Sequence, residues 1–433
     1  MNFSLPYYSK IVQQIKSSPC DTLGNIIEFS TENWSQKDIF TNTFPYIEIA
    51  GVPPGRNEYE IVETNVAEAP SRAKMIVRNE DIIVSTTRPH RGAIAKINCE
   101  YDEITIASTG FCVLRKIKRD DVLKEYLPYV LLSDGVLKQM AQRSSGGNYP
   151  AIIPDEMKKI VIPIVDPQKQ KQLVSNMFVA SQQRSIKLRE AYDFLENICE
   201  SVLKQLGIGK ISILPRDAVA VTLGTLKKDK TLGAGYYHTE RISTIRALER
   251  YESMSTRKLE DIVDFLRNIV SADGGGSYLG LASVMSNIGE LSGVEEEAEG
   301  QALEYDAGDV LYAKLRPYLN KVIYMETGGI CSTEFHVMRI KCDDVLPEYL
   351  AAVMRSKIIV AQTKHMMTGN THPRISDDDV RNLRIPIPPM GIQQFIVNDI
   401  RKRMEESRKL RREAEAEWTE AKEQFEQELK KSQ

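Results

Sequence analysis

Apolar residues follow two contrasting patterns along this chain of 433 residues. Short β-branched runs at 81–85 and 309–312, bounded by Gly, Asn, Asp and Pro, indicate strands. After Pro167, and again after Pro389, apolar residues recur at spacings of three and four, which predicts two helices of about 40 residues each. The chain is therefore expected to have an α+β fold in which modules of short strands are each followed by a long helix.

The predicted helices have thin apolar stripes. At about 1.5 Å per residue each helix would be roughly 60 Å long. A narrow stripe suits a coiled-coil seam better than the broad face of a globular domain, so we expect the two helices to pack antiparallel as a coiled coil. Packing of the last helix on its own domain is the alternative. The residues predicted to form the helix seam or to contact a partner are Val174, Phe178, Leu188, Leu195, Val202, Ile396, Ile400, Met404, Leu410, Trp418 and Phe425.

The chain also contains an internal repeat. Segment 79–89 aligns with 307–317, so that Asp81 and Arg88 match Asp309 and Arg316 with one constant offset. Further matches follow in the same order: the Ile-Pro-Ile run at 162–164 and Gln170 correspond to the same run at 385–387 and Gln393. A common order with nearly constant spacing indicates tandem duplication of one module.

The repeat and the helices together predict four segments. Residues 1–166 form a first module, 167–207 a central long helix, 208–388 a second module, and 389–433 a final long helix. Within the second module, 208–235 is a connection whose structure the pattern does not specify.

The composition is that of an ordinary globular protein, with 42% hydrophobic and 27% charged residues. The net charge of −3 provides no overall basic signature of nucleic-acid binding. The six cysteines form no C-x-x-C pair, and His238 and His336 stand apart from other ligand types, so no metal site is expected. We find neither a basic leader followed by an apolar run nor a membrane-length apolar stretch, and expect a cytoplasmic protein without membrane contact.

Motifs for catalysis are missing from the sequence. There is no G-x-x-x-x-G-K-[ST], G-x-S-x-G or H-E-x-x-H pattern. The cofactor loop and catalytic motif of an adenine methyltransferase are not present either, and the triglycine at 274–276 lacks the strand-to-helix context of a phosphate-binding loop. We therefore expect no catalytic centre and no cofactor in this chain.

The repeated motifs resemble those of the specificity subunit of Type I restriction-modification systems. The resemblance rests on Asp81-Ile82-Ile83 with Arg88-Pro89, on 308–311 with Arg316-Pro317, and on 385–389 with Gln393, and it extends over nearly the whole chain. The segment 208–235 departs from it, because the family usually has only a short connection there.

This resemblance implies a function. Each module would be a target-recognition domain that reads one half of a bipartite site in double-stranded DNA, and the helices would set the spacing. The helices would also dock two methyltransferase subunits, which methylate adenine using S-adenosylmethionine, and restriction and translocase subunits would join that core. The alternative is a non-catalytic coiled-coil scaffold whose modules bind proteins rather than DNA.

Two loops in each module carry the donors, acceptors and cations that DNA recognition requires. One follows the aligned strand, and the other is a glycine-containing loop before the Ile-Pro-Ile run. A solvated turn is the structural alternative for any single residue. For Arg88 and Arg316 a further structural alternative is that the guanidinium holds the loop to a carboxylate such as Asp81 or Asp309. The candidate DNA contacts are Arg88, His90, Arg91, Arg143, Asn148, Tyr149, Lys314, Arg316, Tyr318, Asn320, Lys321, Lys364, Thr368, Asn370, His372 and Arg374.

Overall fold

The chain forms two compact units, which are described one at a time. The first contains Met1–Lys187 and Arg412–Gln433, and the second contains Leu188–Arg411. The two long helices, α6 (Pro167–Glu196) and α13 (Met390–Lys431), each contribute residues to both units. The computed structural model describes residues 12–13, 15–16, 19–35, 40, 42–99, 104–213, 221–224, 226, 233–272, 278–294, 296, 298, 300–369 and 371–431.

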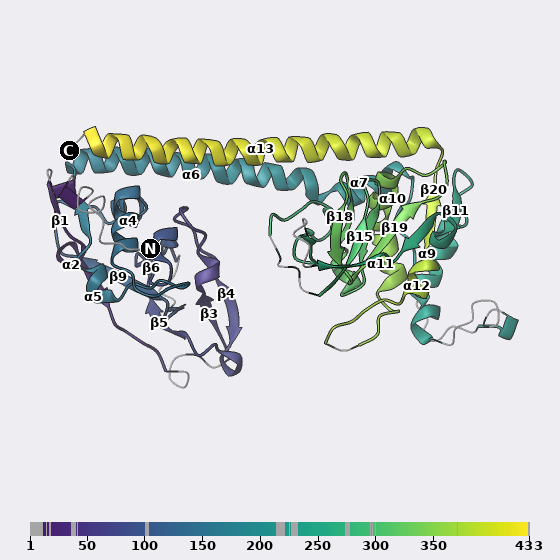
Figure 1. Cartoon of the computed structure of the whole chain (residues 1–433), viewed down its shortest axis with the longest axis horizontal. Helices are drawn as coiled ribbons and strands as arrows, with labels where there is room; N and C mark the ends of the chain where they lie inside the picture. The colour runs from purple at the N-terminus through teal and green to yellow at the C-terminus, as the bar shows by residue number, and fades with distance from the viewer. Residues whose placement is uncertain are drawn as a thin grey trace. The chain divides into compact units, whose positions relative to one another are not determined.

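Short strands dominate the first unit (Figure 1). Its strands are β1 (Cys20–Thr22), β2 (Ile27–Ser30), β3 (Thr43–Ile47), β4 (Val62–Asn65), β5 (Ala73–Val77), β6 (Ile82–Ser85), β7 (Ile94–Lys96), β8 (Thr105–Ser108), β9 (Phe111–Ile117) and β10 (Val161–Pro163). Its helices before α6 are α2 (Leu23–Ile26), η1 (Ile49–Gly51), η2 (Val66–Glu68), η3 (Pro89–Arg91), α3 (Tyr126–Leu131), α4 (Asp134–Gln142) and α5 (Pro154–Met157).

The second unit repeats this order of elements. Its strands are β11 (Ser255–Lys258), β12 (Val263–Leu266), β13 (Ile269–Ser271), β14 (Tyr278–Leu279), β15 (Gln301–Tyr305), β16 (Val310–Ala313), β17 (Val322–Tyr324), β18 (Gly329–Ser332), β19 (Phe335–Ile340) and β20 (Arg384–Ile387). Its helices are α7 (Ile198–Gln205), η4 (Ala234–Tyr237), α9 (Thr239–Leu248), η5 (Leu259–Asp261), η7 (Pro317–Leu319), α10 (Pro347–Met354), α11 (Lys357–Thr363) and α12 (Asp377–Arg381).

The sheets show how closely the units correspond. One antiparallel sheet has the order β2-β9-β6-β7 in the first unit and β12-β19-β16-β17 in the second. Ile82 faces Leu114 across the first of these sheets, as Val310 faces Met338 across the other. The Ile-Pro-Ile strands β10 and β20 pair with β1 and β11. The predicted tandem duplication is thus present in the fold.

The second sheet of each unit differs at one edge. Both contain a three-stranded core with one parallel pair, β3-β8-β5 in the first unit and β14-β18-β15 in the second. The fourth strand is β4 beside β3 in one unit, but β13 beside β15 in the other. The duplicated modules therefore share a frame but not a complete outer sheet.

The central strands of each unit separate two apolar cores. In β6, Ile82 and Val84 pack toward helices α3 and α4, whereas Ile83 packs toward the second sheet. Val310 and Leu311 of β16 divide in the same way. Since neighbouring residues of a strand point to opposite faces, a strand covered on both faces is a continuous apolar run rather than an alternating one.

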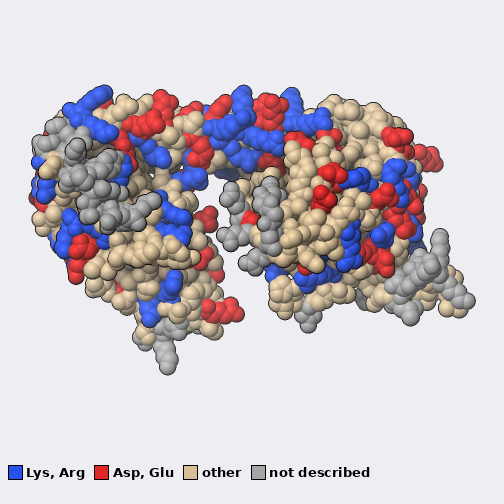
Figure 2. Space-filling model, viewed as in Figure 1, with Lys and Arg blue, Asp and Glu red and all other residues tan. Residues whose placement is uncertain are grey.

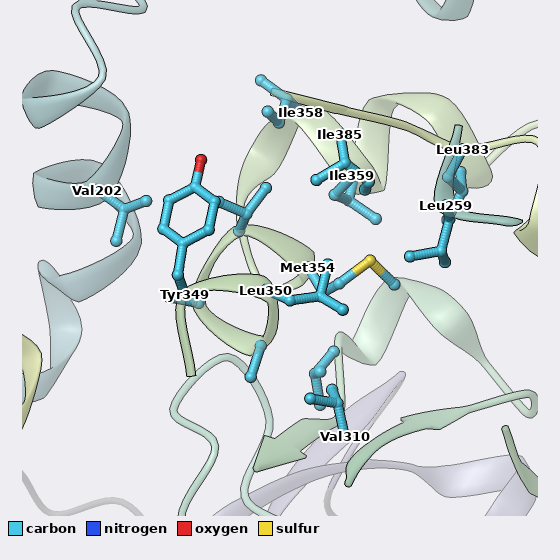
Figure 3. Packing of buried hydrophobic residues seen from close by; sticks show 14 of the residues in the cluster. Val202, Leu259, Val310, Tyr349, Leu350, Met354, Ile358, Ile359, Leu383 and Ile385 are labelled. Carbon is cyan, nitrogen blue, oxygen red and sulfur yellow. The ribbon is translucent and has the colours of Figure 1, made fainter. Parts of the chain in front are cut away.

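Helices and strands close the larger core of the second unit together (Figure 3). The ring of Tyr349 on α10 lies beside Val202 of α7, and Met354 lies nearer to Leu259. The Tyr349 hydroxyl donates to the Pro386 carbonyl of β20 at 2.7 Å, as the Tyr126 hydroxyl donates to Pro163 in the first unit at 3.0 Å.

The long helices run antiparallel where they meet within each unit (Figure 1). In the first unit Lys187 pairs with Glu417 at 2.5 Å, and Lys169, earlier in α6, pairs with Glu428, later in α13. In the second unit the Gln205 amide of α7 donates to Asp399 near the start of α13 at 2.9 Å. No helix in the described part of the chain is long and apolar enough to cross a membrane.

The predicted helix over 167–207 is interrupted. α6 ends at Glu196 and α7 begins at Ile198, with Asn197 between them at φ −94° and ψ 6°. The break is confined to this residue, since the Asn197 carbonyl still accepts from the Ser201 N–H of α7 at 2.9 Å.

Phe178, predicted as a seam or partner contact, is 58% exposed and is not part of the helix seam, because the buried line of α6 passes through Leu173 and Met177. The half-buried members of the predicted set are Val174, Leu188, Met404 and Leu410. Leu195, Val202, Ile396, Ile400, Trp418 and Phe425 are buried. Trp418 and Phe425 pack into the core of the first module rather than against α6 alone.

Candidate nucleic-acid interface

A tight turn follows the central strand of each unit. After β6, Arg88 has φ +47°, Pro89 opens the short helix η3, and Gly92 closes it at φ +74°. After β16, Arg316 has φ +50°, and η7 is closed by Asn320 at φ +54°. Positive φ is costly for residues other than glycine, so the surrounding structure must hold both arginines in this conformation.

A second loop in each unit folds back as a small hairpin. Ser145 pairs with Ala151 in the first unit, and Thr368 pairs with Arg374 in the second. Gly146 and Gly369 bend the chain at φ +107° and +95°. A Cβ atom at either position would lie only 3.1 or 3.2 Å from a carbonyl oxygen. The positive φ and this close approach both favour glycine. The sequence repeat alone pairs Gly147-Asn148 with Gly369-Asn370, but the bridges of the two hairpins make Gly146 the counterpart of Gly369.

The two loops of each module form one face. The Arg88 N–H donates to the Pro150 carbonyl at 2.7 Å, and the Arg316 N–H donates to the Pro373 carbonyl at the same distance. Thr87 bridges to Ala151, and Leu315 bridges to Arg374. Sequence analysis selected the loops separately, and the structure brings them together in both units. These bonds also provide the tertiary support for the positive φ of the arginines.

The loop side chains of the first unit combine an aromatic ring with cations. The Arg88 guanidinium lies 4.4 Å from the centre of the Tyr149 ring and donates to the Asn148 carbonyl at 3.1 Å. The Tyr149 side chain is itself 70% exposed, and His90 and Arg91 are exposed as well. Arg143 instead pairs with Glu156 at 2.7 Å.

In the second unit more cations are paired with acids. Lys364 pairs with Glu240 at 2.6 Å, Arg374 pairs with Glu334 at 2.9 Å, and Lys314 donates to the Thr333 carbonyl at 3.0 Å. The remaining candidates on this face are exposed, namely Arg316, Tyr318, Thr368 and His372. Asn370 lies outside the described residues.

Two candidate contacts in the second unit are corrected by the structure. Asn320 is only 2% exposed, and its amide donates to Asn287 at 3.2 Å and to the Arg355 carbonyl. Lys321 turns inward to donate to the Leu281 carbonyl at 2.6 Å, and burial lowers the pKa of its ammonium group. The Asn320 side chain is thus enclosed within the module and is not available to DNA, whereas Lys321 is half-buried.

The carboxylates considered as structural partners for Arg88 and Arg316 are already engaged. Asp81 binds Arg115 at 2.9 Å, and Asp309 binds Arg339 at 2.7 Å, with both carboxylates almost fully buried. The idea that Asp81 or Asp309 anchors the turn arginines is therefore wrong.

The sequence pattern indicated an isolated His238, but the structure places this residue beside another histidine. Its ring stacks on that of His365 with 3.3 Å between centroids, and His365 lies 3.0 Å from Glu240. These three residues are the possible metal-binding group found among the described residues. The ring planes are only 16° from parallel, and a metal ion lies in the plane of each imidazole that binds it, so this arrangement does not suit one ion.

Charge on the visible surface is mixed, with Lys and Arg interspersed among Asp and Glu (Figure 2). The interface candidates therefore rest on the loop residues themselves.

Comparison with known proteins identifies the family. The model of the Type I restriction modification DNA specificity domain matches residues 21–188 and 252–413. The chain belongs to this family. Each matched region contains one pair of loops, so the specificity modules coincide with the structural repeat.

Curated relatives include the specificity subunits of Type I restriction enzymes EcoDI from Escherichia coli and HindI from Haemophilus influenzae. The chain is 26% identical to the first over 124 residues and 28% identical to the second over 121 residues. The matches cover 29% and 27% of this chain, and only about a quarter of each relative, 26% and 25%.

Solved structures similar to this specificity-domain chain include the HsdS subunit from Thermoanaerobacter tengcongensis, at 18% identity and a TM-score of 0.37, covering 96% of both chains. A Type I S subunit from M. genitalium has 11% identity and a TM-score of 0.42, with 95% of both chains covered. A structure from a study of type I R-M system assembly has 17% identity and a TM-score of 0.47, with 96% and 97% covered.

Proposed function

We propose that the chain is the DNA specificity subunit of a Type I restriction-modification complex. Each module reads one half of a bipartite site in double-stranded DNA through its paired loops, and the chain has no catalytic centre of its own. The observation that carries the proposal is the repetition of one two-loop face, with Arg88 and Arg316 at equivalent positions, in two modules that match the specificity-domain family.

The exposed loop groups suit DNA. Arg316 and Arg91 are cations that can bind phosphate oxygens or guanine edges, and the exposed ring of Tyr149 offers a hydroxyl and an apolar surface. The acids paired with Arg374 and Lys364 reduce the local positive charge. Specific recognition therefore depends on a small number of groups per module, and a partner supplies much of the remaining phosphate contact.

Apolar groups left exposed on the long helices support partner docking. Phe178, Val179, Ile186 and Tyr192 on α6 are 50–58% exposed, and Phe395 on α13 is 64% exposed. Exposed apolar groups of this density on a helix mark protein contacts. We propose that two methyltransferase subunits, which bring S-adenosylmethionine, dock on these helices, that restriction and translocase subunits join them, and that α13, about 63 Å long, helps to set the half-site spacing.

Footprinting of the complex with its methyltransferase partner tests the proposal. Two short protected elements separated by an unspecified gap are expected, because a B-DNA turn spans about 34 Å and two separate readers do not share one short site. Exchange of residues 23–150 for another such module should change one element only. A single uninterrupted element, or a swap that alters both elements, contradicts the two-reader proposal.

Salt titration separates this function from a protein-binding scaffold. A specific duplex binder loses affinity steeply with salt and prefers its own sequence over a scrambled duplex, whereas a scaffold shows no sequence preference. For docking, Phe178→Asp should reduce co-purification of the methyltransferase subunits, while Gln182→Asp, at an exposed polar position on the same helix, serves as the control.

A further inference from the structure

One short loop in each unit connects the long helices to the DNA-facing turn. We call residues 55–58 and 287–290 the coupling loops. In both loops the backbone of one residue makes the connection: the N–H of the first loop residue bonds to the turn, and the C=O of the same residue accepts a bond from a helix.

In the first unit this residue is Gly55. Its N–H donates to the carbonyl of Gly92, which closes the Arg88 turn, at 2.8 Å. The carbonyl of Gly55 accepts from the indole N–H of Trp418 on α13 at 3.1 Å, and Trp418 is 3% exposed. A positive φ of +74° at Gly55 allows this path.

In the second unit Asn287 takes the same place. Its N–H donates to the carbonyl of Asn320, which closes the Arg316 turn, at 3.3 Å, and the two side-chain amides bond to each other. The carbonyl of Asn287 lies 3.4 Å from the Cys199 thiol of α7, which the Arg355 carbonyl approaches to 3.3 Å as a second acceptor. Burial raises the pKa of Cys199, so the thiol keeps the proton that it donates.

A buried charged side chain fixes the far end of each coupling loop to the helices. In the first unit this side chain is an arginine of the helix, and in the second it is a glutamate of the loop. In the first unit Arg184 of α6, 2% exposed, binds Glu58 of the loop and Glu415 of α13, both at 2.8 Å. In the second unit Glu290 of the loop, 5% exposed, binds Arg408 at 2.8 Å and also Arg411 of α13. A buried charge is costly without its partners, so each cluster resists displacement of the loop.

We propose that the coupling loops are positioning devices, which hold each DNA-facing turn in a fixed register to the helix segment of its own unit. Gly55, Glu58, Asn287 and Glu290 act through the turns and contact no DNA themselves. This inference rests on the proposed function, because the register matters only if the turns read DNA. It also explains why Asn320 is buried: its amide ties the turn to the loop.

Hydrogen exchange measured on the full-length chain tests the coupling without DNA. In Glu290→Gln the amides of Leu319 and Asn320, which close the turn, should exchange about tenfold faster, while those of Arg91 and Gly92 remain unchanged. Trp418→Phe removes the bond to Gly55. In this variant the amides of Arg91 and Gly92 should exchange faster, while those of Leu319 and Asn320 remain unchanged. Glu405→Gln, at an exposed position on the same helix, is the matched control and should change neither turn.

Unchanged exchange at both turns in these variants overturns the proposal. Equal acceleration at both turns overturns it too, since the clusters would then support general stability alone. If Glu290→Gln does not fold, Cys199→Ala removes the thiol that lies against the Asn287 and Arg355 carbonyls and carries the same expectation for the second turn.

Mapping of methylated adenines with the assembled complex tests the consequence for DNA. The wild type should modify sites with one spacer length, and Glu290→Gln should extend modification to spacers one base pair longer or shorter. If the wild type has no bipartite site, the proposed function fails whatever the exchange result. If the site exists and the variant keeps its strict spacer, the positioning role fails alone.

Discussion

The two modules agree where the backbone is constrained and differ where side chains meet solvent. Both turns have an arginine at positive φ, and both hairpins have a glycine at positive φ, because each chain path is tied to the other by the same backbone bonds. The side chains on that frame differ: Arg88 lies against Tyr149, whereas Arg316 is exposed. A duplicated frame can therefore present two different recognition surfaces without any change in how it folds.

The outer sheets teach the same lesson at a larger scale. The fourth strand is added to opposite edges of the three-stranded core in the two units. Strand addition at an edge leaves the existing pairs intact, so it can vary while the β6 and β16 sheets stay in register. The following substitutions probe which parts of the two modules are equivalent.

The largest expected effect concerns the shared buried carboxylates. Asp81→Ala and Asp309→Ala should each destabilise their own unit by about 3 kcal/mol, because Arg115 or Arg339 loses a buried partner. Trp34 and Trp418 both belong to the first unit, so their fluorescence during urea unfolding follows that unit, and hydrogen exchange follows the second. Equal losses in both units from either variant would show that the modules are not independent.

Removal of the matched glutamines should have the next largest effect, equal in the two units. Gln170 accepts from the Leu123 N–H and donates to two carbonyls, and Gln393 does the same with Leu346. Each change to Ala should cost about 2 kcal/mol of unfolding free energy, since buried backbone groups lose their partners. Denaturant unfolding with exposed Gln168→Ala as the control measures this, and unequal losses would break the equivalence.

Substitution of the turn arginines should have different effects on stability in the two modules. Arg316→Ala should weaken cognate DNA binding by about 1–3 kcal/mol if it reads a base edge, or reduce the salt slope by about 1 if it binds phosphate, with no loss of stability. Arg88→Ala should weaken binding and also cost about 0.5–1 kcal/mol of stability, because its guanidinium packs on Tyr149. Binding titrations at several salt concentrations, run beside thermal melting, check both. A melting loss with unchanged affinity would make either arginine structural.

The effect expected to be smallest at neutral pH is a difference in acid sensitivity, which develops only as the pH falls. Burial lowers the pKa of His336 to about 3, with Lys314 acting in the same direction, whereas the matching position in the first unit is Cys112. The neutral imidazole is favoured in the folded state, so its contribution is present above pH 6.5 and is lost as the pH falls toward 3. In that window the second unit should lose stability by up to about 1.4 kcal/mol per pH unit.

His336→Cys should remove this slope and make the second unit resemble the first. Unit-resolved unfolding between pH 4 and 7 tests the expectation. A slope that persists in the variant would assign the acid sensitivity to groups other than His336.

Much of the frame could be predicted from the sequence, because it depends on local patterns. The runs beginning at Asp81 and Asp309 are strands, and the aligned arginine and proline mark the same turn in both units. The two loops were also found, since glycine and cations cluster in them. Their contact could not be predicted, because it joins Arg88 to Pro150 through tertiary bonds between backbone atoms.

The errors have physical causes as well. α6 carries apolar residues on two adjacent lines, and spacing alone does not tell Met177, which is buried, from Phe178, which is exposed. Asn320 looked like a DNA contact because of its amide, yet it aligns with Gly92, and that match was the available signal for a turn position with positive φ. The stacking of His238 on His365 joins distant segments and left no trace in the local pattern.

The burial of Trp418, Phe425 and Leu429 in the core of the first module affects how the chain is made. That core also contains Leu23 and Ile26, so its first and last pieces leave the ribosome about 400 residues apart. At about 5–20 residues per second, translation separates them by roughly 20–80 s. The first module must therefore wait with an uncovered apolar face while the second is synthesised, and its final folding step becomes a post-translational event.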